Sequence, residues 1–245
     1  MKQSKQMMLV AGLALATAGT PAMAELSANI AATSNYIWRG VTQSNDRAAI
    51  QGGVDWNDKQ GWYVGTWMSN VDFTNFGGNS EFELDLYGGY GQQINDDWSW
   101  DAGLIYYAYP LGTDVNFLEI YGSATWKWLN FGLNYTLTGD PPSPNPFRSG
   151  DIYYFASAEA PLQGDWAVGA TIGVYDFDDL SSSSTAPDGS LVFGDYAHLQ
   201  LSGTKSTQNM GDFTIAVDFN DLDGNDDFGK DVSDPRIWVS WGTTF

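Results

Sequence analysis

The segment 234-DPRIWVSWGTTF-245 decides the fold. Successive side chains of a β-strand point to opposite faces, so this segment has one largely apolar face and one mixed face. The apolar face carries Ile237, Val239, Trp241, Thr243 and Phe245. This segment alone fits two structures equally well: an ordinary half-buried strand, or the closing strand of a barrel. The choice depends on the rest of the chain.

Eleven further segments alternate in the same way. They lie at 26–38, 47–56, 61–71, 81–90, 98–109, 118–126, 129–138, 152–158, 166–174, 196–202 and 213–219. Many reach ten to twelve residues, which suits a tilted membrane strand of about 9 to 11 residues better than a soluble strand of about 5 to 6. Only 61–71 leaves its orientation open, because both of its faces carry aromatic residues. The sequence therefore predicts an all-β fold, a 12-stranded antiparallel transmembrane β-barrel.

The connections between these segments alternate in length. Those after the second, fourth, sixth, eighth and tenth segments are mostly short, such as 57–60, 127–128 and 161–164, whereas most of the others are longer and rich in Asp, Ser, Gly and Pro. Outer-membrane barrels have short periplasmic turns and longer extracellular loops. We expect the same arrangement here, with the loop Asp176–Gly194 as a candidate for folding into the lumen.

The first 24 residues have a basic start at Lys2 and Lys5, an apolar run over 7–18 and an Ala-Met-Ala site at 22–24. This pattern is typical of a cleaved secretory signal peptide, so we expect residues 1–24 to be removed and 25–245 to form the barrel. The apolar run is too short to cross a bilayer as a helix, and the remaining chain has no longer one. A membrane-spanning form must then be a closed barrel in the cell outer membrane.

Charge and cysteine content exclude several classes of function. Removing two lysines with the signal peptide takes the formal charge from −20 to −22, which argues against nucleic acid as a partner. The chain has no cysteine, so disulfides, thiolate metal sites and thiol catalysis are absent.

The ends of the predicted strands carry two further groups of residues. Six tryptophans near the periplasmic ends are expected to form an aromatic girdle at the lipid interface: Trp56, Trp62, Trp98, Trp126, Trp128 and Trp166. A strand that ends on an aromatic residue also resembles the terminal signature of outer-membrane barrels. We therefore expect Ile237, Val239, Trp241 and Phe245 to be read by the barrel-assembly machinery, and outer-membrane lipids to contact the outer face.

One family resemblance is specific. The stretch 33-TSNYIWRGVTQS-44, followed by 49-AIQGGVD-55, resembles the opening signature of the TorF-type porins of Gram-negative bacteria. The resemblance continues through 65–73, 83–90 and 106–110, and departs from the family pattern at Thr42 and at Ala48-Ala49. It implies an outer-membrane barrel and a pore, and it transfers no functional residue.

Alternation also predicts which polar residues line the pore. The candidates are Arg47, Gln51, Asp55, Glu81, Glu83, Asp85, Asp101, Glu119, Tyr121, His198, Asp218 and Arg236. Carboxylates on the wall concentrate cations and oppose anions, so we predict weak cation preference or passage of neutral solutes. The alternative is that these acids pair with Arg39, Arg47 or Arg236 and only stiffen the barrel.

The sequence gives less support to a metal site or to a catalytic site. The loop 221-DLDGNDD-227 places oxygen ligands as calcium loops do, but Asp226 and Val232 stand where an EF-hand needs Gly and Glu. We predict no cofactor and no defined metal site, with weak Ca²⁺ binding by this loop or by 176–179 as the alternative to solvated acidic loops. His198 is the only histidine, with Ser202 on the same face and no catalytic motif, so we predict no enzyme.

These observations favour a porin for passive diffusion of small hydrophilic solutes. Two alternatives stay open: a narrow or plugged barrel with a structural or surface-binding role, and a soluble secreted β-sandwich that binds a ligand.

Overall fold

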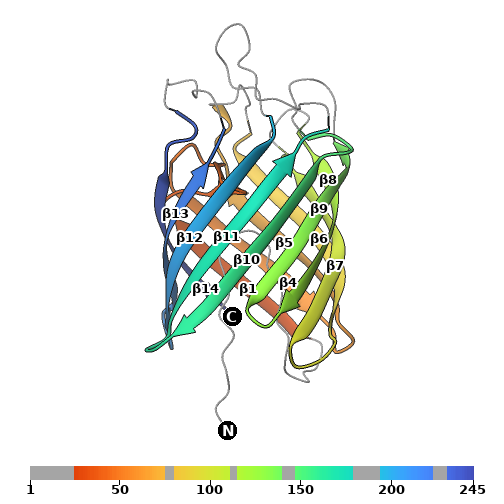
Figure 1. Ribbon diagram of the computed structural model, residues 1–245, viewed down its shortest axis with the longest axis vertical. Helices are drawn as coiled ribbons and strands as arrows, with labels where there is room; N and C mark the ends of the chain where they lie inside the picture. Colours follow the sequence, from red (N-terminus) through yellow and green to blue (C-terminus); the bar gives the residue numbers. More distant parts are fainter. Residues whose placement is uncertain (1–24, 75–79, 111–114, 140–146, 179–193, 223–230) are drawn as a thin grey trace, which may run out of the picture.

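The computed structural model is a closed antiparallel barrel of twelve tilted strands (Figure 1). It describes residues 25–74, 80–110, 115–139, 147–178, 194–222 and 231–245. No helix among these residues is long and apolar enough to cross a membrane. The barrel confirms the predicted fold class and strand number.

The strands follow one another around the barrel in sequence order, and two short extra strands pair with each other inside it. Their bounds are β1 Glu25–Thr33, β2 Ile37–Trp38, β3 Val41–Thr42, β4 Ala49–Asn57, β5 Trp62–Asn70, β6 Phe82–Gln93, β7 Trp98–Ala108, β8 Phe117–Trp126, β9 Leu129–Gly139, β10 Ile152–Leu162, β11 Trp166–Asp176, β12 Tyr196–Thr207, β13 Gly211–Asn220 and β14 Arg236–Thr244.

The last strand closes the barrel, as its sequence indicated. β14 pairs with β1 from Asn29↔Thr244 to Thr33↔Ser240, and β1 pairs with β4 on its other side. The backbone of Phe245 exchanges hydrogen bonds of 2.8 and 3.2 Å with Ala28. No barrel strand is left with an unpaired edge, which removes the backbone groups that a membrane could not satisfy.

Short turns gather at one end of the barrel, which we call the turn end, and longer connections at the other, the loop end (Figure 1). The shortest turn is Lys127-Trp128, where Lys127 has a φ of 59°. The turns after β6 and β12 are shorter than the sequence predicted, because both strands continue further. β6 continues to Gln93, and β12 continues to Thr207 where the sequence suggested a break at Thr204.

The outer face is apolar and exposed. Leu26, Ile50, Val64, Ile172 and Ile237 all lie on it. The strand whose orientation the sequence left open is settled by burial, because Trp62, Val64 and Met68 of β5 are exposed whereas Ser69 is buried. The buried residues therefore lie inside the cylinder, and the core of this protein is its lumen.

The prediction for the first strand was wrong at its end. β1 stops at Thr33, and Tyr36 and Trp38 do not continue it. Residues 34–48, which join β1 to β4, turn inward and form the β2–β3 pair, Ile37↔Thr42 and Trp38↔Val41. We call this segment the inner hairpin. All three clusters of buried hydrophobic residues include its side chains, with Tyr36, Val41 and Ile37 each in a different cluster.

Candidate functional site

The tip of the inner hairpin is a tight turn at Arg39-Gly40. Arg39 has a φ of 48° and Gly40 a φ of 82°. Two successive residues with positive φ are what a two-residue type I′ hairpin requires, and Gly is the residue that adopts the second position at least cost. The Arg-Gly pair thus lets the chain reverse inside the barrel and puts the Arg39 side chain at the leading end.

Arg39 is anchored on one side of the lumen by Glu119 of β8. Its guanidinium donates two hydrogen bonds to the Glu119 carboxylate, at 2.8 and 2.6 Å, and both side chains are almost fully buried. The guanidinium also lies over the rings of Trp38, Tyr153 and Tyr175, 4.2 to 5.1 Å from their centroids. Planar guanidinium groups suit both contacts, because they match a carboxylate bidentately and stack on aromatic faces.

Glu119 itself is held by the barrel wall. Tyr107 of β7 donates to its Oε2 at 3.3 Å and Asn134 of β9 donates to the same oxygen at 2.9 Å. The β8–β9 pairing also shifts register beside it, between Leu118 and Glu119. A bulge re-aims neighbouring side chains, and here it lies at the strand position that receives the hairpin tip.

The opposite side of the tip lies against β12 and β13. A Cβ placed on Gly40 would overlap the Cβ of His198, so the two residues are in close contact. Asn220 donates to the Gly40 carbonyl at 2.9 Å. His198 is buried, its Nε2 lies 2.9 Å from the Tyr153 hydroxyl, and its ring stacks on that of Tyr153. The inner hairpin therefore crosses the lumen from β8 to β12 and β13.

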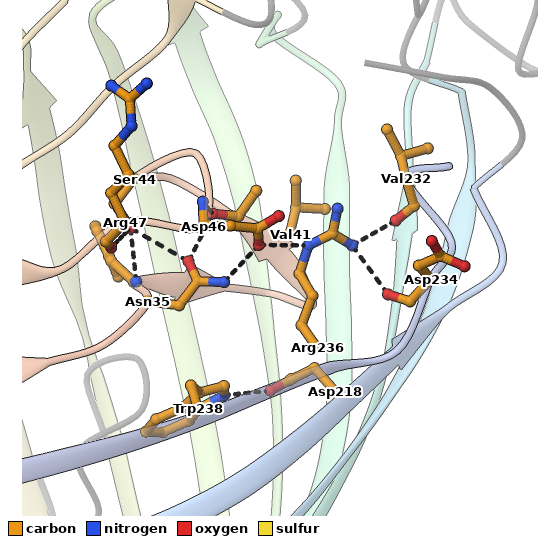
Figure 2. Close-up of polar contacts among 12 residues, drawn as sticks. Asn35, Val41, Ser44, Asp46, Arg47, Asp218, Val232, Asp234, Arg236 and Trp238 are labelled. Atoms are coloured by element: carbon orange, nitrogen blue, oxygen red, sulfur yellow. Dashed lines mark hydrogen bonds and ion pairs between the residues drawn. The ribbon is translucent and has the colours of Figure 1, made fainter. Parts of the chain in front are cut away.

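The base of the inner hairpin is fastened to the closing strand (Figure 2). Arg236 of β14 donates from Nε to Asp46 at 3.0 Å and from Nη1 to the carbonyls of Val232 and Asp234. Asn35 donates to the same Asp46 oxygen at 2.7 Å. Beside this group Trp238 donates to Asp218 at 2.6 Å.

A third contact joins the inner hairpin to β6. The Tyr36 hydroxyl donates to Oε1 of Glu83 at 3.4 Å, and the Tyr36 ring packs edge-on against Trp67. Burial, together with the charges of Glu83 and Asp85, raises the pKa of Tyr36 well above its usual range, so the hydroxyl stays a donor. Glu83 and Asp85 are both buried, yet Oε2 of Glu83 and Oδ1 of Asp85 have no hydrogen-bond partner.

Toward the turn end the polar side chains bond to one another and, apart from the buried Tyr87, are partly exposed. Tyr87 donates to Asp55, and Tyr63 donates to Asp101 at 2.7 Å. The hydroxyls of Tyr63 and Tyr121 are hydrogen-bonded as well. These side chains occupy the space that glycines leave open, since a Cβ on Gly89 would collide with the Tyr63 hydroxyl.

Ten of the twelve predicted pore-lining residues lie on barrel strands. Nine of them belong to the groups just described, and the tenth, Gln51, is hydrogen-bonded to Ser69 at 3.4 Å. The other two do not. Arg47 precedes β4, is 67% exposed and pairs with Asp72, and Glu81 precedes β6 and is exposed. Both residues lie outside the strands because the strands begin two and one residues later than alternation suggested.

Several other predictions fall on the rest of the chain. The loop Asp176–Gly194 and the calcium-like loop Asp221–Asp227 lie largely outside the described residues, as does the expected signal peptide. Among the residues that the structure does describe, no group of three or more His, Asp or Glu side chains is placed to hold a metal ion.

The six predicted girdle tryptophans are all exposed and lie at the turn end. Trp56 and Trp126 are at or near the ends of their strands, Trp62, Trp98 and Trp166 begin theirs, and Trp128 is in a turn. Ile237, Val239 and Phe245 of the predicted assembly signal are exposed on the outer face, and Trp241 donates its indole N–H to the Met210 carbonyl.

Sequence reasoning did not predict the inner hairpin, which is formed by Tyr36, Ile37, Trp38, Arg39 and Val41. It named Arg39 only as one possible partner of the wall acids, and the structure shows such a pair with Glu119. The signal was present, because four apolar or aromatic residues lie around an Arg-Gly turn in a stretch that was divided between a strand end and a loop. A loop that faces water has no reason to be so apolar. The same stretch carries the most specific part of the TorF-type resemblance.

Comparison with known proteins agrees with this fold. The structure is similar to solved structures of the KdgM porin (9% identity, TM-score 0.54, 89% of this chain and 98% of that one) and of the NanC porin (12% identity, TM-score 0.55, 90% and 98%). Another similar structure is described as the KdgM porin in complex with disordered oligogalacturonate (8% identity, TM-score 0.52, 90% and 97%). At these identities the likeness shows the fold alone.

No curated protein matches the chain. A family model does, over residues 16–245, and its description is "bacterial protein of unknown function (Gcw_chp)". The match includes the inner hairpin and all twelve barrel strands. The chain therefore belongs to the Gcw_chp family of bacterial proteins.

Proposed function

We propose that this protein is an outer-membrane porin for passive diffusion of small hydrophilic solutes, and that the inner hairpin sets how much passes. The observation that carries the proposal is a set of polar side chains on the inner face of a barrel whose outer face is apolar, with a hairpin held across the lumen by side chains. Water-filled barrels need the first feature, and a constriction inside the lumen is how porins limit what they admit. The TorF-type resemblance of residues 33–55 supports the same function.

The charges of the wall residues indicate which solutes are expected to pass. The wall carries the carboxylates of Asp55, Asp101 and Asp218 in addition to those of Glu83 and Asp85, whereas Arg39 and Arg236 are taken up by ion pairs. An excess of carboxylate in a narrow lumen disfavours anions. We therefore expect small neutral or cationic solutes, in contrast to the polyanionic oligogalacturonate named for the similar KdgM porin.

The second candidate function is a plugged barrel with a structural or surface-binding role. Burial of the hairpin tip favours it, because a guanidinium and a carboxylate that are 7% and 1% exposed leave little room for water beside them. The two candidates differ in one measurable property, the conductance of the unmodified protein.

Single-channel recording in planar lipid bilayers tests the proposal. The protein should be compared with a variant in which residues 37–42 are replaced by Gly-Gly, a short link because the Gln43 amide already donates to the Tyr36 carbonyl at 2.7 Å. We expect a small conductance for the unmodified protein and a several-fold larger one for the variant. Reversal potentials in asymmetric KCl should show cation preference.

A liposome-swelling assay with small neutral sugars provides the readout for uncharged solutes. If the unmodified protein neither conducts nor admits sugars while the variant does, the protein is plugged in its resting form and the second candidate holds. Clear anion selectivity would contradict the predicted role of the wall carboxylates.

A further inference from the structure

Glu83 and Asp85 are two carboxylates that share one face of β6 and lack a counter-ion. Residues two apart on a strand point the same way, with Cα atoms roughly 7 Å apart. Both side chains are about 1% exposed, so neither is solvated like a surface acid. Burying an ionised carboxylate costs several kcal/mol unless it is paired or coordinates a metal.

No side-chain cation within the described residues pairs with them. The arginines inside the barrel are committed elsewhere, Arg39 to Glu119 and Arg236 to Asp46. Arg47 lies at the loop end and pairs with Asp72. Either protons or a cation from outside the described residues must therefore neutralise these two acids.

The unpartnered atoms are the ones that a metal ion would take. Oε2 of Glu83 and Oδ1 of Asp85 are buried and make no hydrogen bond. The opposite oxygen of Glu83 is held by the Tyr36 hydroxyl at 3.4 Å, which orients the carboxylate and leaves Oε2 available. Other wall acids differ. Asp218, for example, is hydrogen-bonded by Trp238 at 2.6 Å and by Gln200 at 3.1 and 3.3 Å.

Neutral oxygen ligands lie in the same part of the wall. Ser69 of β5 is paired in register with Glu83, and Gln51 of β4 is paired in register with Ser69 and donates to its hydroxyl. Gln51 therefore keeps its own side-chain oxygen for another partner. Oxygen-only ligand sets with two carboxylates suit hard divalent cations, and Ca²⁺ in particular tolerates irregular geometry and completes its shell with water.

We infer that Glu83 and Asp85 form a binding site for one hard divalent cation of the Ca²⁺ class inside the barrel, beneath the inner hairpin. The bound ion neutralises the two carboxylates and, through the Glu83–Tyr36 contact, stabilises the hairpin against β6. The site does not include the acidic segments 176–179 and 221–227. The inference goes beyond the proposed function, because it holds whether or not the barrel conducts.

Calcium binding and thermal stability of the folded barrel in a neutral detergent test the inference. Equilibrium dialysis against CaCl₂ should give one Ca²⁺ fewer per chain for the Glu83→Gln/Asp85→Asn variant than for the unmodified protein. Asp218→Asn is the matched control, because Asp218 is a similarly buried wall acid whose oxygens already accept hydrogen bonds from Trp238 and Gln200. This variant should bind as much Ca²⁺ as the unmodified protein. Binding to surface loops is common to all three proteins and cancels.

The unfolding midpoint, followed by the gel shift of the heat-treated barrel, provides the second readout. In EGTA the double variant should be at least as stable as the unmodified protein, because it lacks two adjacent charges. CaCl₂ should raise the midpoint of the unmodified protein in a saturable way and leave that of the double variant unchanged. NaCl of equal ionic strength should not reproduce the rise.

Three results would overturn the inference: equal Ca²⁺ stoichiometry in the double variant, the same rise with NaCl, or a double variant that is more stable at every Ca²⁺ concentration. The last would mean that protons neutralise the pair. If the double variant does not fold, Asp85→Asn alone serves, since Asp85 makes no hydrogen bond that the amide would break. Conductance is not measured, so failure here leaves the proposed function standing, and the reverse also holds.

Discussion

At the scale of single residues, two arginines of the same connection have opposite surroundings. Arg39 is buried, pairs bidentately with Glu119 and lies against three aromatic rings, whereas Arg47 is largely exposed and pairs with Asp72. A buried pair that loses one partner leaves a charge without compensation, and an exposed pair loses little. Equal residue types eight positions apart should therefore differ strongly in their effect on stability.

We expect Arg39→Ala to lower the free energy of unfolding by about 3 to 5 kcal/mol, because Glu119 is left buried and unpaired. Arg47→Ala, the matched control, should change it by less than about 1 kcal/mol. Urea unfolding in lipid vesicles measures both. Adding Glu119→Gln to Arg39→Ala should recover part of the loss, and equal losses for the two single variants would contradict the anchoring role of Arg39.

Sequence predicts the wall residues better than their partners. The alternation of side chains along each strand assigned Glu83, Asp85 and Glu119 to the inner face of the barrel, because residues two apart on a strand point the same way. It could not reveal that Arg39 would reach Glu119, 80 positions away, because that contact depends on how a loop folds in three dimensions. A different limit applies to Arg47 and Glu81, which lie just before β4 and β6, because alternation does not fix the residue at which a strand begins.

At the scale of the element, the inner hairpin depends on its turn. Gly40 has a φ of 82° and lies against His198 so closely that no side chain fits between them. The apolar residues around this turn could have indicated burial, but the sequence offered a different loop, Asp176–Gly194, as the inward segment. The composition of a loop does not show whether that loop enters the lumen. For the inner hairpin, the Arg-Gly turn and the contact with Glu119 hold it there.

Gly40→Ala should loosen the inner hairpin for two separable reasons. Positive φ costs an alanine about 1 to 2 kcal/mol, and the new Cβ collides with His198. Gly40→Ala combined with His198→Gly, which removes the Cβ that the new methyl group would meet, relieves only the collision. We therefore expect partial recovery of the urea midpoint when the double variant is measured against His198→Gly alone. Gly203→Ala is the control, because its Cβ would meet only Ile215 at 3.9 Å. A full recovery would show that backbone conformation at Gly40 does not matter.

At the scale of the whole molecule, closure of the cylinder rests on β14 and β1. Backbone hydrogen bonds between Phe245 and Ala28 extend that seam to the turn end, and the Phe245 side chain is 77% exposed on the outside. The sequence was sufficient to predict this closure, since the number of strands is even and both end strands have one apolar face. The alternation of apolar and polar residues is enough to predict that the barrel closes, but it does not predict which residues fill the lumen.

Deleting Phe245 should sharply reduce the fraction of heat-modifiable barrel in isolated outer membranes. Phe245→Ala keeps the two backbone hydrogen bonds and removes only the aromatic side chain, so it separates recognition of the terminal residue from pairing of the seam. We expect both variants to assemble poorly if the side chain is read by the assembly machinery, and Asp218→Asn in the lumen to assemble normally. Normal assembly of both Phe245 variants would contradict a role for this residue as a signal.

The fastening of the inner hairpin to Arg236 has a consequence for the order of folding. Asp46 and Arg236 are 190 residues apart, and Arg236 belongs to the last strand to be made. Contacts of such long range form late, because the chain between them must be ordered first. The inner hairpin can therefore become fully fixed only after the final strand has arrived. Folding should end in two steps: the cylinder closes first around a wide lumen, and the hairpin then locks across it and narrows it.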